Sequence, residues 1–502
     1  MRVEKRIYAR LTPKNQANDK VTESAPAIKA GADFCYAMIG ANANMLNPTF
    51  TTQQLADRIR ETDASVLVVV NELYPSVKDA IRQTKIRTVV SYPAVNSLGL
   101  FVKLAKKAKK IPGTLAWNDF IKAGNSAVPG KELPYEKDAP AIMVYSSGTT
   151  GASKGIQLTN DGINATTIQY ESTGFDMKRQ DRYFAQIPIW FSTGIVVTML
   201  VPLCLGITVI LEPQYDFELF YQHIEKYKPN FLITAVGLVD YLRSKKEISP
   251  AYKAFKYLAI GGEYVTPHAE SVFNNWLEEN GSPSKLHKGY GMCECGGTVT
   301  TTIPKSNKVG SSGVPMAKVT VAAFDLNTGE ELKYGQRGEI RVLTPCRMLG
   351  YYKNPKATAD YFKTDKKGNE WACTGDMGYV LEDGSVYVDG RISDSYANAR
   401  GETIYLFDIE RTILSIDAVR QCKTVVSEIN GAQTHVAHIS LDKGQNNPDA
   451  VIGQIRAVCR EKLPENHFPH YLKIHADALP VAPSGKLNTA MMKSDIQDLI
   501  EI

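Results

Sequence analysis

Several classes of protein are excluded by what this 502-residue sequence has little of. Cysteine is scarce: there are eight, none forms a CxxC pair, and none stands with histidine at the spacing of a zinc site. The cysteines therefore predict reduced, mostly buried thiols and a reducing compartment. An excess of one charge is also missing, because 58 Lys and Arg against 53 Asp and Glu give a net charge of +5. That balance argues against a dedicated nucleic-acid binder and suits small anionic substrates such as nucleotides.

Signals for export and for membrane insertion are missing as well. Residues 1–20 are polar and basic without an apolar core, so we expect no signal peptide and a cytoplasmic protein. One apolar run, residues 194–211, has nearly the length of a membrane span, but Pro202 and Gly206 interrupt it and β-branched residues end it. We expect a buried helix, a turn and a buried strand there, and no membrane span.

Alternating helix and strand patterns predict an α/β fold. Thr51 and Gln54 have the spacing of a capping box at the start of a helix over 51–63. The apolar segments 66–70 and 88–90 flank a short helix that begins at Pro75. This strand–helix–strand order is typical of parallel sheets covered by helices. Further short apolar strands are expected at 141–145, 207–211, 231–234 and 257–260.

The pattern changes in the second half of the chain. Between about residues 319 and 390, short alternating strands joined by Gly and Asn/Asp turns predict a β-rich subdomain, with strands at 319–325, 338–343 and 385–389. Beyond a Gly/Asp turn at 390–394 we expect a small α+β unit, with a helix over 450–463 that has one apolar face: Val451, Ile452, Ile455, Val458 and Cys459. The predicted organisation is a large α/β domain, residues 1–390, and a small mobile α+β domain, residues 391–502.

The segment 145–155, Tyr-Ser-Ser-Gly-Thr-Thr-Gly-Ala-Ser-Lys-Gly, has the composition of a phosphate-binding loop. It follows an apolar strand, and its small residues let backbone N–H groups approach phosphate oxygens. The hydroxyls add donors, and Lys154 adds a mobile positive charge. The segment does not match the Walker A pattern. The alternative is a flexible surface loop, since clusters of Ser, Gly and Thr are common in such loops.

Five motifs in order resemble those of the AMP-forming adenylating enzymes, a superfamily that includes acyl-CoA synthetases, nonribosomal peptide adenylation domains and luciferases. The loop is similar to the phosphate-binding loop of that superfamily, with Ser153 in place of the usual proline, a change that we expect to matter little. The other motifs are Gly-Tyr-Gly-Met-Cys-Glu at 289–294, Trp-Ala-Cys-Thr-Gly-Asp at 371–376, Gly-Arg-Ile-Ser-Asp at 390–394 and Pro-Ser-Gly-Lys-Leu-Asn at 483–488. The resemblance runs from about residue 39 to the end, and the region before Asn47-Pro48 is shorter than is usual in the superfamily.

The resemblance assigns nucleotide-binding roles to matching positions. Tyr290 would stack on adenine, and Asp376 and Arg391 would bind the ribose. Contacts with ATP or AMP are expected from Ser146, Ser147, Gly148, Thr149, Thr150, Gly151, Gly262, Glu263, Tyr290, Gly291, Cys293, Asp376 and Arg391.

The resemblance also assigns catalytic roles to three charged residues. Glu294 would hold Mg²⁺, Lys154 would bind the phosphates, and Lys486 would bridge the carboxylate of the acid and the α-phosphate of ATP. Cys293 replaces the superfamily's threonine, which touches the α-phosphate. A thiol is a poorer donor than a hydroxyl, so we expect slower adenylation.

The acid pocket is expected to have an apolar lining: Trp190, Phe191, Val236, Gly262 and Met292. Phe191 stands where many acyl- and aryl-CoA ligases have histidine. No acidic residue occurs between Asp181 and Glu212, and burying an ammonium group without a counter-charge is costly, so an amino-acid substrate is disfavoured. We expect a hydrophobic carboxylic acid; the sequence leaves open whether it is acyl, aryl or sterol-like.

The activity that the resemblance implies is ATP-dependent formation of acyl-AMP, followed by transfer of the acyl group to coenzyme A. Asp394 would be the hinge between the domains, and Gly401 would face the coenzyme A channel. ATP, Mg²⁺, coenzyme A and a small carboxylic acid are the expected ligands, and a homodimer is left open. Two alternatives remain. In the first, the acyl acceptor is a carrier protein, which the lack of a carrier domain after residue 502 disfavours. In the second, the chain is an acyl- or nucleotide-binding relative with impaired turnover, as Cys293 and Ser393 suggest.

Overall fold

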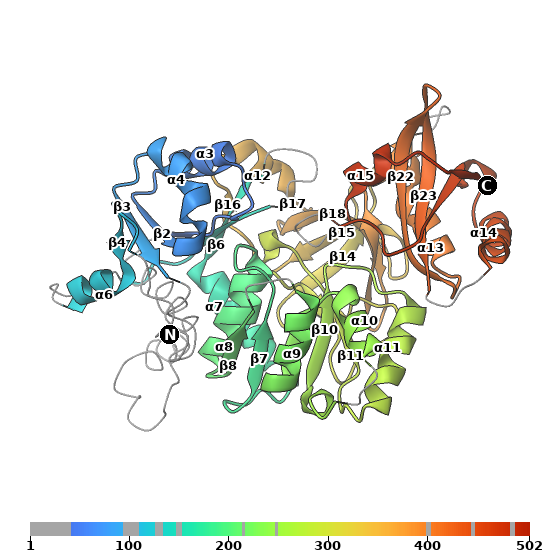
Figure 1. Cartoon of the computed structure of the whole chain (residues 1–502). Helices are drawn as coiled ribbons and strands as arrows, with labels where there is room; N and C mark the ends of the chain where they lie inside the picture. Colours follow the sequence, from blue (N-terminus) through green and yellow to red (C-terminus); the bar gives the residue numbers. More distant parts are fainter. Residues whose placement is uncertain are drawn as a thin grey trace.

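The computed structural model describes residues 42–93, 110–125, 134–146, 153–212, 216–245, 249–397, 403–442, 447–481 and 487–502. These residues form a large N-terminal α/β domain followed by a smaller C-terminal domain, which lies at one end of the molecule in Figure 1 (orange to red). The fold class expected from the sequence is therefore confirmed. The domain limit at residues 390 and 391 stays a prediction.

The first described helix and sheet form as the sequence predicts. Thr51 caps the N-terminus of helix α3 (Thr52–Thr62). Its hydroxyl accepts a hydrogen bond from the backbone N–H of Gln54, and the Gln54 side chain accepts one from the backbone N–H of Thr51. A parallel three-stranded sheet follows, made of β2 (Val66–Val70), β3 (Thr88–Tyr92) and β4 (Leu115–Ala116). Its connections contain α4 (Tyr74–Arg82) and the 3₁₀ turn η2 (Asn71–Leu73), and α6 (Trp117–Asn125) follows β4.

A mixed four-stranded sheet carries the ends of the predicted phosphate loop. Its strands, in order, are β1 (Ala43–Asn44), β5 (Pro140–Tyr145), β6 (Gly155–Thr159) and β16 (Gly350–Tyr351). Strand β5 is parallel to β1 but antiparallel to β6. The loop therefore joins the two strands of a hairpin, and the strand that follows it was not foreseen from the sequence.

The largest sheet has seven strands. Five are parallel to their neighbours, in the order β11 (Leu286–Tyr290), β10 (Tyr257–Gly261), β9 (Phe231–Thr234), β7 (Arg182–Ala185) and β8 (Thr208–Leu211); β12 (Thr300–Thr301) and β13 (Val314–Pro315) extend the sheet antiparallel beyond β11. The helical segments around this sheet are α7 (Asn160–Glu171), α8 (Val201–Cys204), α9 (Phe217–Tyr227), α10 (Val236–Ser244) and α11 (Pro267–Glu279), with short turns η5 (Tyr252–Ala254) and η6 (Cys293–Cys295).

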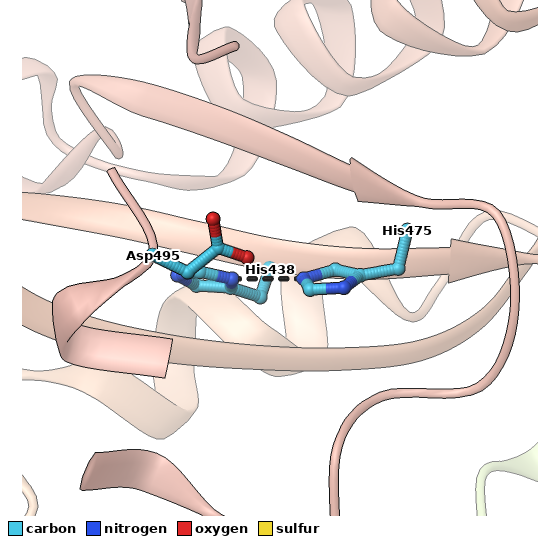
Figure 2. Close-up of side chains that lie close together, drawn as sticks. All are labelled: His438, His475 and Asp495. Carbon is cyan, nitrogen blue, oxygen red and sulfur yellow. Dashed lines mark hydrogen bonds between the residues drawn. The ribbon is translucent and has the colours of Figure 1, made fainter. Parts of the chain in front are cut away.

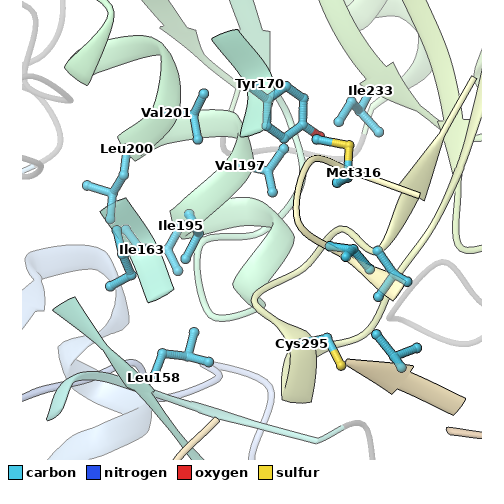
Figure 3. Close-up of a cluster of buried hydrophobic side chains, with 14 of the residues drawn as sticks. Leu158, Ile163, Tyr170, Ile195, Val197, Leu200, Val201, Ile233, Cys295 and Met316 are labelled. Carbon is cyan, nitrogen blue, oxygen red and sulfur yellow. The ribbon is translucent and has the colours of Figure 1, made fainter. Parts of the chain in front are cut away.

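The long apolar run folds into helix, turn and strand as expected, but the expectation of a buried strand was wrong, because β8 is the edge strand of its sheet and none of its residues is fully buried. Its helical part begins as a π-helix, η4 (Thr193–Leu200), continues as α8, and is followed by β8. From Gly194 to Leu200 every residue is buried, and Figure 3 shows Ile195, Val197 and Leu200 in one cluster with Leu158 and Met316. Across the described residues, each helix is too short or too polar to span a membrane.

The β-rich segment is a five-stranded antiparallel sheet. Strands β14 (Thr320–Phe324), β15 (Gly338–Leu343), β18 (Glu370–Val380) and β17 (Phe362–Thr364) lie in that order, β19 (Val386–Arg391) also pairs with β18, and α12 (Pro355–Tyr361) precedes β17. The three strands that the sequence predicts here are confirmed. The sheet places Asp376 on β18 directly opposite Arg391 on β19.

The C-terminal domain contains a two-stranded and a four-stranded sheet. The first is β20 (Ser395–Ala397) with β21 (Thr403–Tyr405); the second, in order, is β22 (Val419–Ile429), β23 (Ala432–Leu441), β24 (Tyr471–His475) and β25 (Ile500–Glu501). The helical segments are α13 (Leu406–Ile413), α14 (Pro448–Lys462), η7 (Glu465–His467) and α15 (Thr489–Ser494). Four of the five apolar residues predicted for one face of α14 are buried, and Val458 is half-buried.

Candidate functional site

The described ends of the predicted phosphate loop are held close together. The backbone N–H of Ser146 donates to the carbonyl of Lys154 at 3.0 Å, and the N–H of Lys154 donates to the Ser146 hydroxyl at 3.0 Å. The Ser153 hydroxyl donates to the carbonyl of Ser146 at 2.6 Å. Proline at position 153 could not make this bond, but two other hydrogen bonds close the hairpin, and the expectation that the substitution matters little stays a prediction.

A buried carboxylate joins three of the motif residues. Asp376 is only 4% exposed, accepts a hydrogen bond from the Tyr290 hydroxyl at 2.5 Å, and forms an ion pair with the Arg391 Nε at 3.0 Å. Arg391 also donates to the carbonyl of Thr374 at 2.8 Å. Burial raises the pKa of the Asp376 carboxyl, and the positive charge of Arg391 opposes that shift. Residues more than 80 positions apart in sequence thus form one polar cluster.

A second cluster surrounds the predicted metal ligand. The Tyr351 hydroxyl donates to Glu294 Oε1 at 2.9 Å, and the Lys154 Nζ lies 4.7 Å from the centroid of the Tyr351 ring. A tyrosine thereby positions the carboxylate, and its ring faces the lysine that the sequence assigns to the phosphates. Carboxylate oxygens suit a hard cation such as Mg²⁺, so Glu294 fits the group expected there.

The segment between Tyr290 and Thr298 lies tightly against the segment that begins at Pro188. A Cβ on Gly291 would lie 2.2 Å from the carbonyl oxygen of Gly297, and one on Gly194 would lie 2.0 Å from the carbonyl oxygen of Pro188. The Thr193 hydroxyl donates to the carbonyl of Gly297 at 3.3 Å. Each of those two glycines allows its own segment to turn back on itself. Between the segments, a Cβ on Gly297 would lie 3.0 Å from the backbone nitrogen of Thr193, so glycine at 297 allows their close approach.

The residues predicted for the acid pocket on these two segments are partly buried. Trp190 and Phe191 are half-buried, with ring centroids 6.2 Å apart. Met292 and Cys293 pack against the main apolar cluster, and the Met292 sulfur accepts a hydrogen bond from the Tyr361 hydroxyl at 3.1 Å. The surroundings of Met292 and Cys293 are therefore largely apolar.

The remaining predicted wall and adenine residues lie at the ends of β9 and β10. Val236 is the first residue of α10, and the Glu263 carboxylate is within hydrogen-bonding reach of its backbone. Gly262 has φ of 77° and open space where a Cβ would stand. Both segments follow parallel strands of one sheet, which is where α/β proteins commonly bind ligands.

A family model described as AMP-binding enzyme matches residues 31–352. The chain belongs to the AMP-binding enzyme family. A curated relative, the long-chain-fatty-acid–CoA ligase of Bacillus subtilis, is 26% identical over 498 residues, which cover 94% of this chain and 84% of the relative. The sulfoacetate–CoA ligase of Cupriavidus necator is 25% identical over 461 residues, covering 89% and 81%.

Solved structures share the fold of this AMP-binding enzyme. ATP-bound MatB from Rhodopseudomonas palustris superimposes with a TM-score of 0.77 at 19% identity, covering 99% of this chain and 93% of that one. The anthranilate CoA ligase AuaEII, in complex with anthranoyl-AMP, gives a TM-score of 0.76 at 20% identity, covering 92% and 84%. Both likenesses support the two-domain architecture.

The predicted hinge of this AMP-binding enzyme takes part in an ion-pair network. Asp394 lies 2.9 Å from the Lys423 Nζ, which also pairs with Glu410 at 3.0 Å. A further ion pair crosses the predicted domain limit, because Asp240 of α10 pairs with Arg420 of β22 at 2.9 Å. Charged contacts therefore hold the two sides of the limit in the observed arrangement.

Some predicted site residues lie outside the described residues, and their roles stay predictions: Ser147, Gly148, Thr149, Thr150, Gly151, Gly401 and Lys486. Conversely, the structure brings two tyrosines to the site that sequence analysis missed. Tyr351 and Tyr361 contact Glu294 and Met292, respectively. The one sequence signal for Tyr351 was its place just after a Gly, in a β-rich region, and that signal is too common to single it out.

Proposed function

We propose that this AMP-binding enzyme is an AMP-forming acid–CoA ligase that acts on a hydrophobic carboxylic acid. The observation that carries the proposal is the cluster of Tyr290, Asp376 and Arg391, which presents an aromatic ring, a carboxylate and a guanidinium together. A nucleoside offers a base to stack on the ring and two ribose hydroxyls to donate to the carboxylate. Each oxygen of Asp376 has one protein partner, and a carboxylate oxygen accommodates a second hydrogen bond.

The first step joins the acid to the nucleotide. An oxygen of the acid's carboxylate attacks the α-phosphorus of ATP, the bond from that phosphorus to the bridging oxygen breaks, and pyrophosphate leaves. Lys154 would bind the phosphates, and Lys486 would offset the repulsion between carboxylate and phosphate, since a preorganised cation acts where two anions approach. When bound, Mg²⁺ supplies charge neutralisation of the phosphates. Glu294, oriented by Tyr351, would hold it.

The second step transfers the acyl group to a thiol. The sulfur of coenzyme A attacks the carbonyl carbon of acyl-AMP, AMP leaves, and no side chain of the protein has to act as a nucleophile. The curated relatives include proteins named as a fatty-acid, a 4-coumarate and a sulfoacetate CoA ligase, which supports coenzyme A as the acceptor. The acids in those names are chemically diverse, so the acid class rests on this chain's own residues.

The hydrophobic class of acid is supported by the residues near the predicted pocket. Trp190, Phe191 and Met292 are half-buried, and the π-helix that follows Phe191 is buried from Gly194 to its end. Between Asp181 and Glu212 the chain has no acidic side chain to pair with an ammonium group. An apolar acid gains about 0.8 kcal/mol for each methylene that such surroundings remove from water.

ATP–pyrophosphate exchange with a panel of acids tests the proposal. We expect exchange with apolar acyl or aryl acids and none with amino acids or short polar acids such as sulfoacetate. The active acid should then give its CoA thioester and AMP in equal amounts, and a phosphopantetheine-loaded carrier protein should not replace coenzyme A. Exchange with polar acids alone would contradict the acid class, and no exchange with any acid would contradict the activity.

A further inference from the structure

The C-terminal domain holds a group of side chains that the proposed reaction does not use. His438 on β23, His475 at the end of β24, and Asp495, which follows α15, each offer one ligand atom. These three atoms all lie within 4.8 Å of one another. Figure 2 shows the His475 ring facing one edge of the His438 ring, with the Asp495 carboxylate beside it.

Strand register explains why the two histidines meet. Strands β23 and β24 are parallel, with His438 opposite Lys473 and Ser440 opposite His475. Residues opposite each other and residues two apart point to the same face of a sheet, so both imidazoles are on one face. Helix α15 covers that face through a small apolar cluster made of Val425, Val436, Leu479 and Met492. The cluster of ligand atoms lies where this apolar layer gives way to polar residues.

The hydrogen bonds of the histidines are incomplete. His438 is fully buried, and its Nδ1 lies 2.9 Å from the His475 Nε2, so the two rings share one hydrogen bond. The other ring nitrogen of His438 is buried and has no hydrogen-bond partner among the described residues. Burying an imidazole nitrogen without a partner is costly. The nitrogen that faces His475 is Nδ1, and it is this atom that could ligate an ion together with the His475 Nε2.

One nearby positive charge competes for the carboxylate. The Lys473 Nζ is 3.3 Å from Asp495 Oδ1, but it also donates to the Gln497 carbonyl at 2.7 Å and lies 3.9 Å from Asp498. Lys473 therefore has other acceptors. A carboxylate has two oxygens, so Asp495 can face the lysine with one and ligate a cation with the other.

We propose that His438, His475 and Asp495 bind a divalent transition-metal ion, with Zn²⁺ as the probe of first choice. Two imidazole nitrogens and one carboxylate oxygen suit Zn²⁺, whereas Ca²⁺ and Mg²⁺ prefer oxygen ligands throughout. Zn–N bonds of about 2.0–2.1 Å in a tetrahedron set two nitrogens about 3.4 Å apart. The observed 2.9 Å reaches that separation by a small rotation of the partly exposed His475 ring. A water molecule would complete the coordination.

The proposed ion would link three separate segments of the C-terminal domain. It would hold Asp495, just after α15, against strands β23 and β24. Because α15 has only six residues, the ion would add to the few contacts that so short a helix makes. Binding to the folded chain alone stabilises that chain by mass action. Zinc should therefore raise the thermal unfolding temperature as well as bind.

Zinc titration of the full chain tests the site. Untagged protein freed of metal by a chelator is titrated with Zn²⁺ by calorimetry, and with Co²⁺ while the visible absorption of tetrahedral cobalt is followed. We expect a saturable site for one ion per chain. His475→Gln and Asp495→Asn should each weaken binding at least about 100-fold, since even the loss of a group that only supports a ligand costs 10- to 100-fold. His467→Gln, which changes a histidine of η7 outside the cluster, is the matched control and should bind as the parent does.

Three results would overturn the proposal: no saturable binding to the parent chain, unchanged binding in both folded site variants, or an equal loss in His467→Gln. Circular dichroism establishes that each variant is folded. Because His475 and Asp495 are both partly exposed, we expect both variants to fold, and either one alone decides the question. A Mg²⁺ titration under the same conditions should show no binding at this site, which separates it from the predicted magnesium ligand Glu294.

Discussion

Replacing Asp376 with asparagine tests the nucleotide site most directly. The carboxylate is buried beside Tyr290 and Arg391, at 2.5 Å and 3.0 Å. Asparagine keeps the shape and one acceptor oxygen but loses the charge and the second acceptor. In the proposed complex, one ribose hydroxyl therefore loses its acceptor and the other bonds to a neutral group. Asp376→Ala removes both acceptors and should be the more severe change.

The expected magnitude follows from the bonds that are lost. A hydrogen bond to a charged group contributes about 1.5–3 kcal/mol, and a neutral one about 1 kcal/mol. Asp376→Asn should therefore cost about 2–3 kcal/mol of ATP binding, which corresponds to a KM for ATP raised about 30- to 150-fold. Because ribose is bound equally in the ground state and the transition state, kcat should change little. The order of preference among acids should stay the same.

The assay is ATP–pyrophosphate exchange at saturating acid, with ATP varied. Asp389→Asn is a matched control, because Asp389 is equally buried and pairs with Arg337 and Arg411 but makes none of the proposed ribose contacts. It should destabilise the fold without raising the KM for ATP. A changed acid preference with unchanged ATP dependence, or an equal rise in KM for Asp389→Asn, would refute the reasoning.

Four further predictions have defined outcomes. Cys293→Thr should speed adenylation or leave it unchanged, with Cys293→Ala slower than Cys293→Thr, in pre-steady-state measurements of acyl-AMP formation; a hundredfold loss in Cys293→Thr would contradict the assignment. Lys486→Ala should slow adenylation about 10²- to 10⁴-fold but spare thioester formation from preformed acyl-AMP, and an equal loss in both steps would argue against its role. Tyr351→Phe should lower kcat/KM for ATP about tenfold and raise the Mg²⁺ requirement, whereas Tyr352→Phe should change neither. Burial lowers the pKa of His287 from 6.5 to about 4. As the pH falls from 6.5 to 4, the unfolded chain therefore binds a proton at His287 while the folded chain does not, and the free energy of unfolding should drop by about 3 kcal/mol. Urea titrations across this pH range measure the drop, and His287→Gln should remove it.

Short apolar segments and motifs allowed much of the fold to be predicted from the sequence. The parallel strands β9 and β10 are short, mostly apolar segments, and that pattern depends only on local composition. The capping box at Thr51 is equally local. The pairing of β5 with β6 was missed, because which strands pair depends on contacts that the segment itself does not encode.

The site was predictable only where a motif carries it. Tyr290, Asp376 and Arg391 belong to three separate motifs. One sheet sets Asp376 opposite Arg391, and Tyr290 reaches Asp376 from a strand of another sheet. Tyr351 belongs to none of the motifs, and it reaches Glu294 because β16 pairs with β6. His438 and His475 likewise meet only through strand register. Side chains that meet through sheet topology leave no signal in the spacing of residues along the chain.

The π-helix at Thr193–Leu200 bears on how the length of this segment can vary. Its hydrogen bonds span five residues where those of an α-helix span four. Deleting one residue therefore lets the segment close as an α-helix while both of its ends keep their places. Such a deletion removes one side chain from the layer next to Phe191 and leaves the surrounding strand order intact. Deleting a single codon could thus enlarge the space beside Phe191 without moving the ends of the segment. The same deletion in a regular α-helix would shift one of those ends.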